Sequence, residues 1–188
     1  MLFRSLQRTQ DRLFLDAANG GYHTSVASPD LLVRMKEDGD NVIPSANATA
    51  VRNGLKLATL TGDRDFRAAA DSTLRFFGPA LRSRPYTLAR LVPALAWAEG
   101  RIREIVITGE PSLESTRSLV AALRRSSLRD AVVVLGGSDV HLQELAALIP
   151  SLRSFPKTGE SSFGYVCRDF TCQAPSSDYA SFLRALSV

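Results

Sequence analysis

The chain has 188 residues, of which 45% are hydrophobic and 22% charged, and a formal net charge of +4. This composition is typical of soluble globular domains, and the sequence holds no apolar run long enough for a transmembrane helix. The arginines are scattered instead of forming a basic block, so we expect neither nucleic acid nor a membrane as a partner.

The N-terminal segment can be interpreted in two ways. Apolar residues recur at helical spacing along residues 2–16, and Asn19-Gly20-Gly21 then breaks the pattern, which predicts a first helix. Three arginines in the same stretch are also typical of an organelle transit peptide, which would place the protein in mitochondria. The amphipathic pattern favours the helix and a cytoplasmic location.

Helical signals dominate the rest of the first half. Residues 22–26 are expected to form a short strand or an extended loop, and residues 36–45 a polar loop. Ser45 is the predicted N-cap of a helix that Gly62 ends, and a second helix is expected to end at Gly78-Pro79. A third is predicted over residues 86–99. Residues 1–103 therefore resemble consecutive helical hairpins, the pattern of a helical stack or toroid.

The pattern changes after residue 103. Short β-rich runs at 104–107 and 131–135 flank a helical segment at 112–126, and such a crossover predicts parallel strands. A helix at 138–149, a strand at 161–167 and a helix at 176–186 complete the expected order. We therefore predict a mainly α fold with a small α/β part over residues 104–188.

Two pairs of residues that follow the predicted strands, Thr108-Gly109 and Gly136-Gly137, lie where ligands bind in open α/β sheets. Neither matches a dinucleotide fingerprint or a phosphate-binding loop. Simple turn glycines are the favoured interpretation.

The loop before Ser45 carries the candidate site. Glu37, Asp38 and Asp40 lie close together in the sequence, and paired carboxylates can perform acid–base chemistry. His23 and Asn47 could bind a polar ligand beside them. The same acids also suit ordinary loop and cap positions, which is the alternative interpretation.

Cys167 and Cys172 are separated by four residues, a spacing that differs from the C-x-x-C redox motif. A disulfide across a tight turn and a pair of buried thiols both remain open, and so does the choice between a structural and a redox role for the pair. Two cysteines cannot form a cysteine-only zinc site, and both histidines lie far from them in sequence, so no metal or cofactor is predicted. Low cysteine use fits a reducing compartment.

Seven segments together resemble one protein family. They are residues 5–16 (SLQRTQDRLFLD), 20–22 (GGY), 36–40 (KEDGD), 44–47 (PSAN), 57–62 (LATLTG), 105–109 (IVITG) and 165–172 (YVCRDFTC) with Pro175. The chain is similar to the C-terminal portion of the spermatogenesis-associated protein 20 and YyaL family. The family's loop often reads Asp-Gly-Ala-Glu-Pro-Ser, whereas this chain has Ile43 in place of the glutamate.

The resemblance implies a thioredoxin-like domain followed by an α/α toroid of the six-hairpin glycosidase type in the whole proteins. This chain would match only part of the toroid, so we expect apolar faces that neighbouring hairpins would otherwise cover. The toroid suggests a small polar ligand, such as a sugar, in carbohydrate metabolism. The alternatives are a non-enzymatic interaction or regulatory module, or a truncated product without independent function. The missing domains, carried on another chain, are a further candidate partner.

Overall fold

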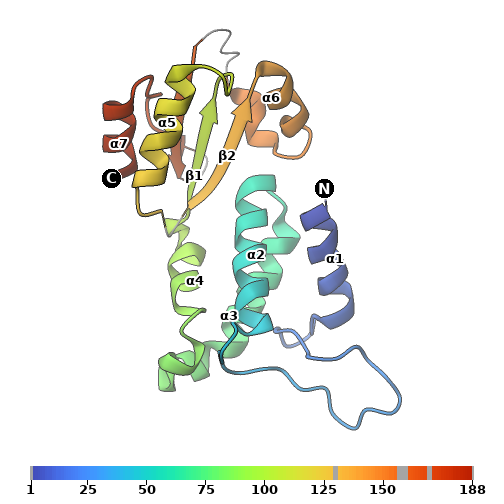
Figure 1. Ribbon diagram of the computed structural model, residues 1–188. Coiled ribbons are helices and arrows are strands. Elements are labelled where there is room, and N and C mark those ends of the chain that lie inside the picture. Colours follow the sequence, from blue (N-terminus) through green and yellow to red (C-terminus); the bar gives the residue numbers. More distant parts are fainter. Residues whose placement is uncertain (1, 129–130, 156–160, 169–170, 188) are drawn as a thin grey trace. The chain divides into compact units, whose positions relative to one another are not determined.

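A computed structural model describes residues 2–128, 131–155, 161–168 and 171–187 (Figure 1). The chain divides into two compact units, Met1–Glu99 and Gly100–Val188. The boundary predicted from the sequence lay four residues later, after residue 103. The first unit is helical and the second contains a four-stranded sheet. The prediction of a mainly α fold with a small α/β part is confirmed at this level.

The first unit contains a packed helical hairpin. Its long helices are α1 (Leu2–Phe14), α2 (Ala46–Thr61) and α3 (Arg64–Ser83). The Ser45 hydroxyl accepts a hydrogen bond from the Ala48 N–H and caps α2, as predicted. Gly62 ends α2 in the left-handed conformation at φ 69°, and α3 begins two residues later. Buried apolar residues then join α2 to α3, among them Val51, Leu55, Phe66, Leu74 and Phe77.

The predicted end of the second helix at Gly78-Pro79 was wrong, because α3 continues to Ser83 with Pro79 inside it. Proline lacks the N–H that would bond to the preceding turn. Phe77 and Leu81 lie on either side of Pro79, and both are buried. Their packing offsets the lost hydrogen bond and carries the helix one turn further.

The single helix predicted over residues 86–99 was also wrong. The segment forms a 3₁₀ turn η1 (Pro85–Leu88), a short α4 (Val92–Ala96) and a π turn η2 (Trp97–Arg101). Pro93 cannot donate to a preceding turn, so a continuous helix is interrupted there. Leu88 and Leu91 are fully buried, as their spacing indicated, whereas Leu95 is 39% exposed.

Residues 15–45 connect α1 to α2 largely without regular structure. Tyr22 makes an isolated bridge with Leu15, and the Thr24 N–H donates to the Met35 carbonyl. Of the two predictions for residues 22–26, the extended loop is therefore confirmed.

The second unit is built on a mixed sheet with strand order β2-β1-β3-β4. The strands are β1 (Arg103–Thr108), β2 (Ala131–Gly137), β3 (Phe163–Arg168) and β4 (Thr171–Cys172). β1 and β2 are parallel and joined through α5 (Glu114–Arg125), which confirms the predicted crossover. β3 returns antiparallel to β1. The short β4 was not predicted, because two residues are too few to show a periodic pattern.

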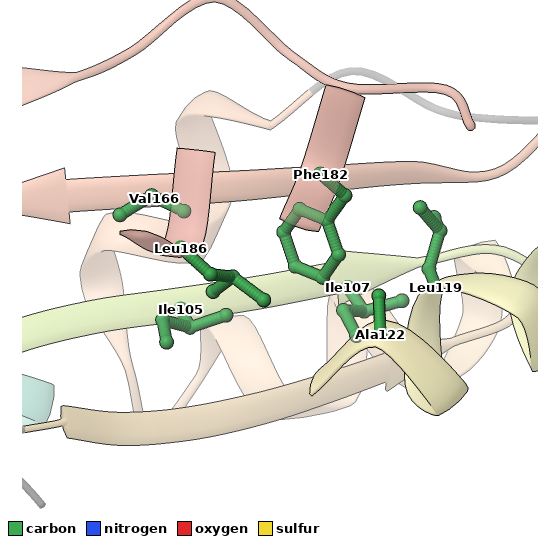
Figure 2. Close-up of a cluster of buried hydrophobic side chains, with 7 residues drawn as sticks. All are labelled: Ile105, Ile107, Leu119, Ala122, Val166, Phe182 and Leu186. Atoms are coloured by element: carbon green, nitrogen blue, oxygen red, sulfur yellow. The ribbon is translucent and has the colours of Figure 1, made fainter. Parts of the chain in front are cut away.

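Helices cover both faces of this sheet (Figure 1). α5 and α7 (Tyr179–Ser187) pack on one face, and α6 (Asp139–Ala146) with η3 (Pro150–Ser154) lies on the other. Figure 2 shows the core on the α5 side, where Ile105, Ile107 and Val166 meet Phe182. Leu119, Ala122 and Leu186 complete the cluster. Gly164 is required here, because an added Cβ would lie 2.5 Å from the Phe182 ring.

In the parts of the chain that the structure describes, no helix is long and apolar enough to cross a membrane.

Candidate functional site

Asn47 joins three segments of the first unit at the start of α2. Its buried Oδ1 accepts a hydrogen bond from the Tyr22 N–H at 2.6 Å. Its Nδ2 donates to the carbonyl oxygens of Tyr22, at 3.1 Å, and of Glu37, at 3.3 Å. These bonds hold the glycine turn at 20–21 and the acidic loop against α2. Asn47 therefore positions these two loops, and any effect of Asn47 on a ligand is indirect.

Asp40 fastens the acidic loop at two points. Its Oδ1 accepts a hydrogen bond from the Ser45 N–H at 2.9 Å, and its Oδ2 accepts one from the Arg90 N–H at 2.8 Å. Its own N–H donates to the Thr87 carbonyl at 2.6 Å. The carboxylate therefore connects the start of α2 to the segment after η1, and both of its oxygens are engaged.

The other two predicted acids lie nearer to solvent. Glu37 Oε2 accepts a hydrogen bond from the Ala46 N–H at 3.3 Å, where the helix dipole of α2 favours a negative charge. Asp38 has a 72% exposed side chain with Oδ2 3.7 Å from an Arg84 nitrogen, a separation that contributes little to stability. Among the described residues, no group donates a hydrogen bond to Asp38.

His23 belongs to a half-buried charged cluster with Asp16 and Lys36. Its Nδ1 lies 3.1 Å from the Arg34 carbonyl oxygen, so this nitrogen carries the proton in the neutral ring. Its Nε2 lies 3.8 Å from Asp16 Oδ2, too far for a hydrogen bond. Lys36 Nζ donates to the same Asp16 oxygen at 2.8 Å and to the Gly20 carbonyl. His23 Nε2 therefore remains an acceptor that a ligand hydroxyl could use.

The pKa values of Asp16 and Tyr22 are shifted away from neutral pH, which distinguishes this region from a catalytic acid–base pair. Hydrogen bonds from Lys36 and Asn19 hold the pKa of Asp16 well below its ordinary value. Burial raises the pKa of Tyr22, and the bond from its hydroxyl to Asp11 at 2.6 Å adds to that shift. A group that exchanges protons in catalysis needs a pKa near the working pH. Neither shift brings the pKa toward neutral pH, so Asp16 and Tyr22 are poor candidates for proton transfer.

A small pocket of about 180 Å³ borders the acidic loop and α2. Pro44 and Arg90 line it, and Asp40 holds both because it binds the N–H groups of Ser45 and Arg90. Thr49 and Asn53 line it from α2, together with the cations of Arg52 and Lys56.

The cations of this pocket are only partly satisfied. Within the described part of the chain, the buried Nε of Arg52 has no hydrogen-bond partner. The Arg52 guanidinium lies 5.4 Å, and Lys56 Nζ 5.6 Å, from the Trp97 ring centroid. Three cations around one small volume favour a ligand with negative charge or several acceptor oxygens.

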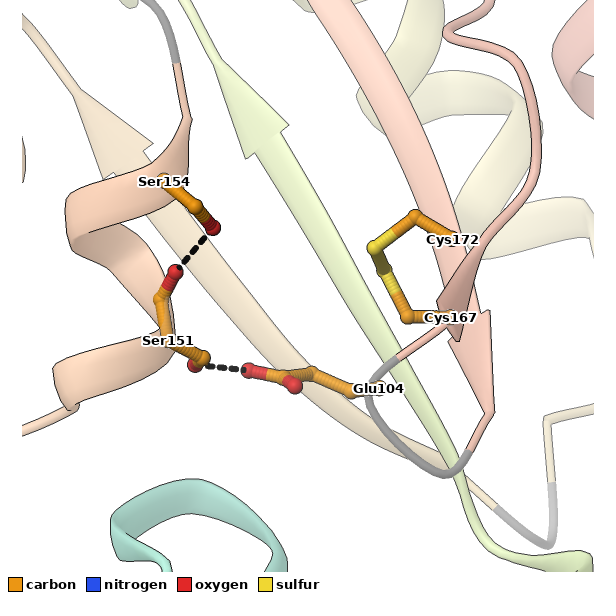
Figure 3. The surroundings of a disulfide bond; sticks show 5 residues. All are labelled: Glu104, Ser151, Ser154, Cys167 and Cys172. Atoms are coloured by element: carbon orange, nitrogen blue, oxygen red, sulfur yellow. Dashed lines mark hydrogen bonds between the residues drawn. A yellow bond between two sulfur atoms is a disulfide. The ribbon is translucent and has the colours of Figure 1, made fainter.

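The two cysteines lie far from this region in the sequence and belong to the second unit. Cys167 and Cys172 are paired residues of β3 and β4 and form a disulfide (Figure 3). Of the two alternatives left open by the sequence, the structure therefore contains the disulfide. Cys167 is buried and Cys172 exposed. Asp169 and Phe170 of the 165–172 motif lie outside the described residues.

A buried carboxyl group lies on the strand beside the disulfide. Glu104 of β1 is the cross-strand partner of Cys167, and its Oε1 accepts a hydrogen bond from the Ser151 hydroxyl at 3.1 Å. Burial raises the pKa of Glu104, and the bond from Ser151 opposes that shift. Figure 3 shows these side chains together.

Sequence reasoning placed His23, Asn47 and the acidic loop in one region. The structure brings Asn47 and the acidic loop together at the start of α2, and His23 follows Tyr22, whose backbone Asn47 binds. It missed Asp16 and Lys36, whose ion pair spans 20 residues, and the pocket cations Arg52 and Arg90. The Lys36-Glu37-Asp38 run could have drawn attention to Lys36. Among the described residues, no group of three or more histidine, cysteine, aspartate or glutamate side chains could hold a metal ion.

Comparison with known proteins supplies the family context. Human spermatogenesis-associated protein 20 is 31% identical over 175 residues, which make up 92% of this chain and 22% of the human protein. The mouse protein gives the same values, and the uncharacterized protein B0495.5 of Caenorhabditis elegans is 28% identical over 171 residues. No protein-family profile and no solved structure matches the chain.

The chain spans about a fifth of the length of these curated relatives, a share that agrees with the predicted match to one portion only. Over that portion the chain is related in sequence to the spermatogenesis-associated protein 20 family, and the resemblance predicted from its motifs is confirmed.

Proposed function

We propose that the first unit is a part of an α/α toroid that binds a small polar ligand, and that a sugar with an acidic group is the class that fits. The observation that carries the proposal is the pocket of about 180 Å³ at α2, which three cationic side chains line, those of Arg52, Lys56 and Arg90. Its volume suits a monosaccharide. Its cations suit a carboxylate or phosphate group on that sugar.

The acids predicted from the sequence have distinct places in this proposal. Asp40 fixes the pocket walls, Glu37 holds the loop at the helix start, and Asp38 remains exposed for contact with a ligand. Catalysis by these carboxylates remains a prediction, and it requires that the pocket first binds a ligand. The activity of the whole relatives, in carbohydrate metabolism or otherwise, is a further proposal.

Trp97 offers a direct test, because it is the single tryptophan and Arg52 and Lys56 lie over its ring. We expect glucuronate and glucose 6-phosphate to change its fluorescence saturably, and glucose to bind more weakly. Arg90→Gln keeps the backbone N–H that Asp40 binds but should abolish the effect. Arg64→Gln removes an exposed charge outside the pocket and should retain it.

Two results would refute this proposal. One is that none of the three sugars changes the fluorescence saturably. The other is that Arg90→Gln and Arg64→Gln bind equally well. Separately, unchanged binding in both Asp38→Asn and Asp40→Asn would remove the acidic loop from the site.

A second candidate function, association with another chain or with other domains, is favoured by the exposure of α1. Leu2, Phe3 and Leu6 are 75%, 51% and 58% exposed, although the sequence indicated a shared apolar side. The buried residue of this helix is Gln7. Uncovered apolar side chains on one helix are typical of docking surfaces. Sedimentation velocity should show self-association that Leu6→Gln weakens, and a monomer at all concentrations would argue against a second copy as partner.

A further inference from the structure

The second unit contains an open pocket of about 590 Å³ that plays no part in the proposed sugar site. Ile107 and Leu135 line it from the sheet, Val120 and Ala121 line it from α5, and Gly109 and Gly137 lie at the carboxyl ends of β1 and β2. The Gly109 N–H donates to the Gly137 carbonyl at 2.9 Å. The two glycine turns noted in the sequence thus meet at the edge where open α/β sheets bind ligands.

The apolar floor exists because α5 covers β1 but leaves β2 uncovered. Val133 and Leu135 are register partners of Ile105 and Ile107, so all four side chains lie on the same face of the sheet. The two β1 residues are fully buried, whereas Val133 is 42% and Leu135 55% exposed. β2 is also an outer strand of the sheet. An apolar surface therefore lies open beside the helix.

Arginines supply the charged rim of this pocket. On α5, Arg117, Val120, Ala121 and Arg124 occur at the i, i+3, i+4 and i+7 spacing that places residues on one side of a helix, and Arg125 follows. All three arginines are exposed, and none forms a hydrogen bond or ion pair with any other described residue. No aspartate or glutamate is among the described residues that line the pocket.

We propose that this pocket binds a small amphipathic anion, with an apolar chain or ring against Leu135, Val120 and Ala121 and a carboxylate or phosphate group paired with the arginines. The volume falls within the range of about 300–1,000 Å³ found for small-molecule sites, which are mostly apolar with a few placed polar groups. A guanidinium group binds either head group through paired N–H donors. A sugar would leave its hydroxyls unpaired against the apolar floor.

The test is a titration of the ¹⁵N-labelled chain, followed by amide NMR shifts, with octanoate, octyl phosphate and 1-octanol. The three probes share one chain length and differ in the head group. We expect saturable shifts in α5 and β2, with at least one anion binding about tenfold more tightly than the neutral alcohol. The stronger of the two anions identifies the head group as carboxylate or phosphate.

Matched variants separate the charge from the apolar floor. The triple variant Arg117→Gln/Arg124→Gln/Arg125→Gln should lower anion affinity to that of octanol. The triple variant Arg64→Gln/Arg75→Gln/Arg153→Gln removes the same charge from exposed positions outside the pocket and should change nothing. Ala121→Trp, at an exposed helix position, should block all three probes while circular dichroism stays native.

Equal affinity for octanoate, octyl phosphate and octanol would overturn the proposal, as would shifts confined to other parts of the chain. An equal loss of anion affinity in the two triple variants would also overturn it. In that case the arginines would act only through the net charge of the chain and not by contact with the ligand. None of these outcomes depends on the sugar site, which is tested by Trp97 fluorescence.

Discussion

In the first unit, the buried centre around the start of α2 is polar, whereas in the second unit the cluster between β1, β3, α5 and α7 is apolar. Asn47 and Ser45 are almost fully buried, and both bind backbone groups. All six residues of β1 are buried, and Ile105, Ile107 and Phe182 meet in a core without hydrogen bonds between side chains. The structure of the first centre thus depends on hydrogen-bond partners, and that of the second on the shape and volume of packed apolar side chains.

This difference indicates how each unit tolerates change. A polar centre fails when one partner is removed, because the remaining buried groups lose their hydrogen bonds. An apolar centre fails in proportion to the volume that is lost. The same contrast separates the two proposed sites: the pocket at α2 is built from polar groups, and the pocket at β2 from an uncovered apolar face with a charged rim.

Phe182→Ala should have the largest effect, a loss of about 4 kcal/mol in the free energy of unfolding of the second unit. The ring is fully buried and packs against Gly164, so its removal leaves a cavity that the sheet cannot close. Urea unfolding followed by far-UV circular dichroism measures the change. Tyr86→Ala, at a 77% exposed position, serves as control and should change stability by less than about 0.5 kcal/mol. If Phe182→Ala changed stability as little as Tyr86→Ala, the Phe182 ring would not be tightly packed in this core.

Asn47→Ala should destabilise the first unit by about 3 kcal/mol, because it leaves the N–H and carbonyl of Tyr22 and the carbonyl of Glu37 without a partner. Trp97 fluorescence during urea unfolding reports on this unit. Asn53→Ala, in the same helix and half-buried, is the matched control, with an expected change below about 1 kcal/mol. If the two alanine variants were equally stable, the idea of a polar centre would have to be abandoned.

Reduction of the Cys167–Cys172 disulfide should lower the stability of the second unit by about 2 kcal/mol, since a short closed loop restricts the unfolded chain. Alkylation under denaturing conditions without reductant should label no thiol, and after reduction two. The variant Cys167→Ser/Cys172→Ser should match the stability of the reduced chain. Two alkylated thiols in the chain before reduction would show that the pair is not bonded in solution.

Periodic signals and caps were sufficient to predict much of the fold. Ser45 and Gly62 bounded α2 as expected, and the β-rich runs on either side of α5 gave the parallel pair. The failures occurred at prolines. Pro79 lies within α3 because tertiary packing outweighs a local breaker, and Pro93 interrupts a segment whose leucine spacing indicated one helix.

The candidate sites were predicted only in part, because they depend on contacts between distant segments. The glycine turn, His23 and the acidic loop could be grouped from motifs, but the ion pair of Asp16 with Lys36 follows from the path of the loop that connects α1 to α2. The pocket at β2 could not be predicted, since its existence depends on which strand α5 leaves uncovered. Local patterns identify elements, whereas the open surfaces arise from how the elements are placed.

Glu104→Gln should have the smallest effect and the most informative pH dependence. Glu104 is 5% exposed, and burial raises its pKa above the ordinary value of 4.5. At this group the folded chain therefore binds more protons than the unfolded chain between these two pKa values, so the contribution of Glu104 to stability is greatest below 4.5 and falls as the pH rises through the folded pKa. Glutamine keeps an acceptor for Ser151 and removes the charge, so the variant should be more stable at neutral pH and nearly unchanged below 4.5.

The exposed Glu144 of α6 provides the control for this titration, because Glu144→Gln removes the same charge without a burial effect. Urea unfolding of both variants at a series of pH values, followed by far-UV circular dichroism, gives the comparison. A gain for Glu104→Gln that is independent of pH, or a loss at neutral pH, would mean that the carboxylate has a compensating partner when charged. The charged form of Glu104 would then be held by polar partners as firmly as the buried groups around Asn47 are, and the contrast between the two units would be one of degree.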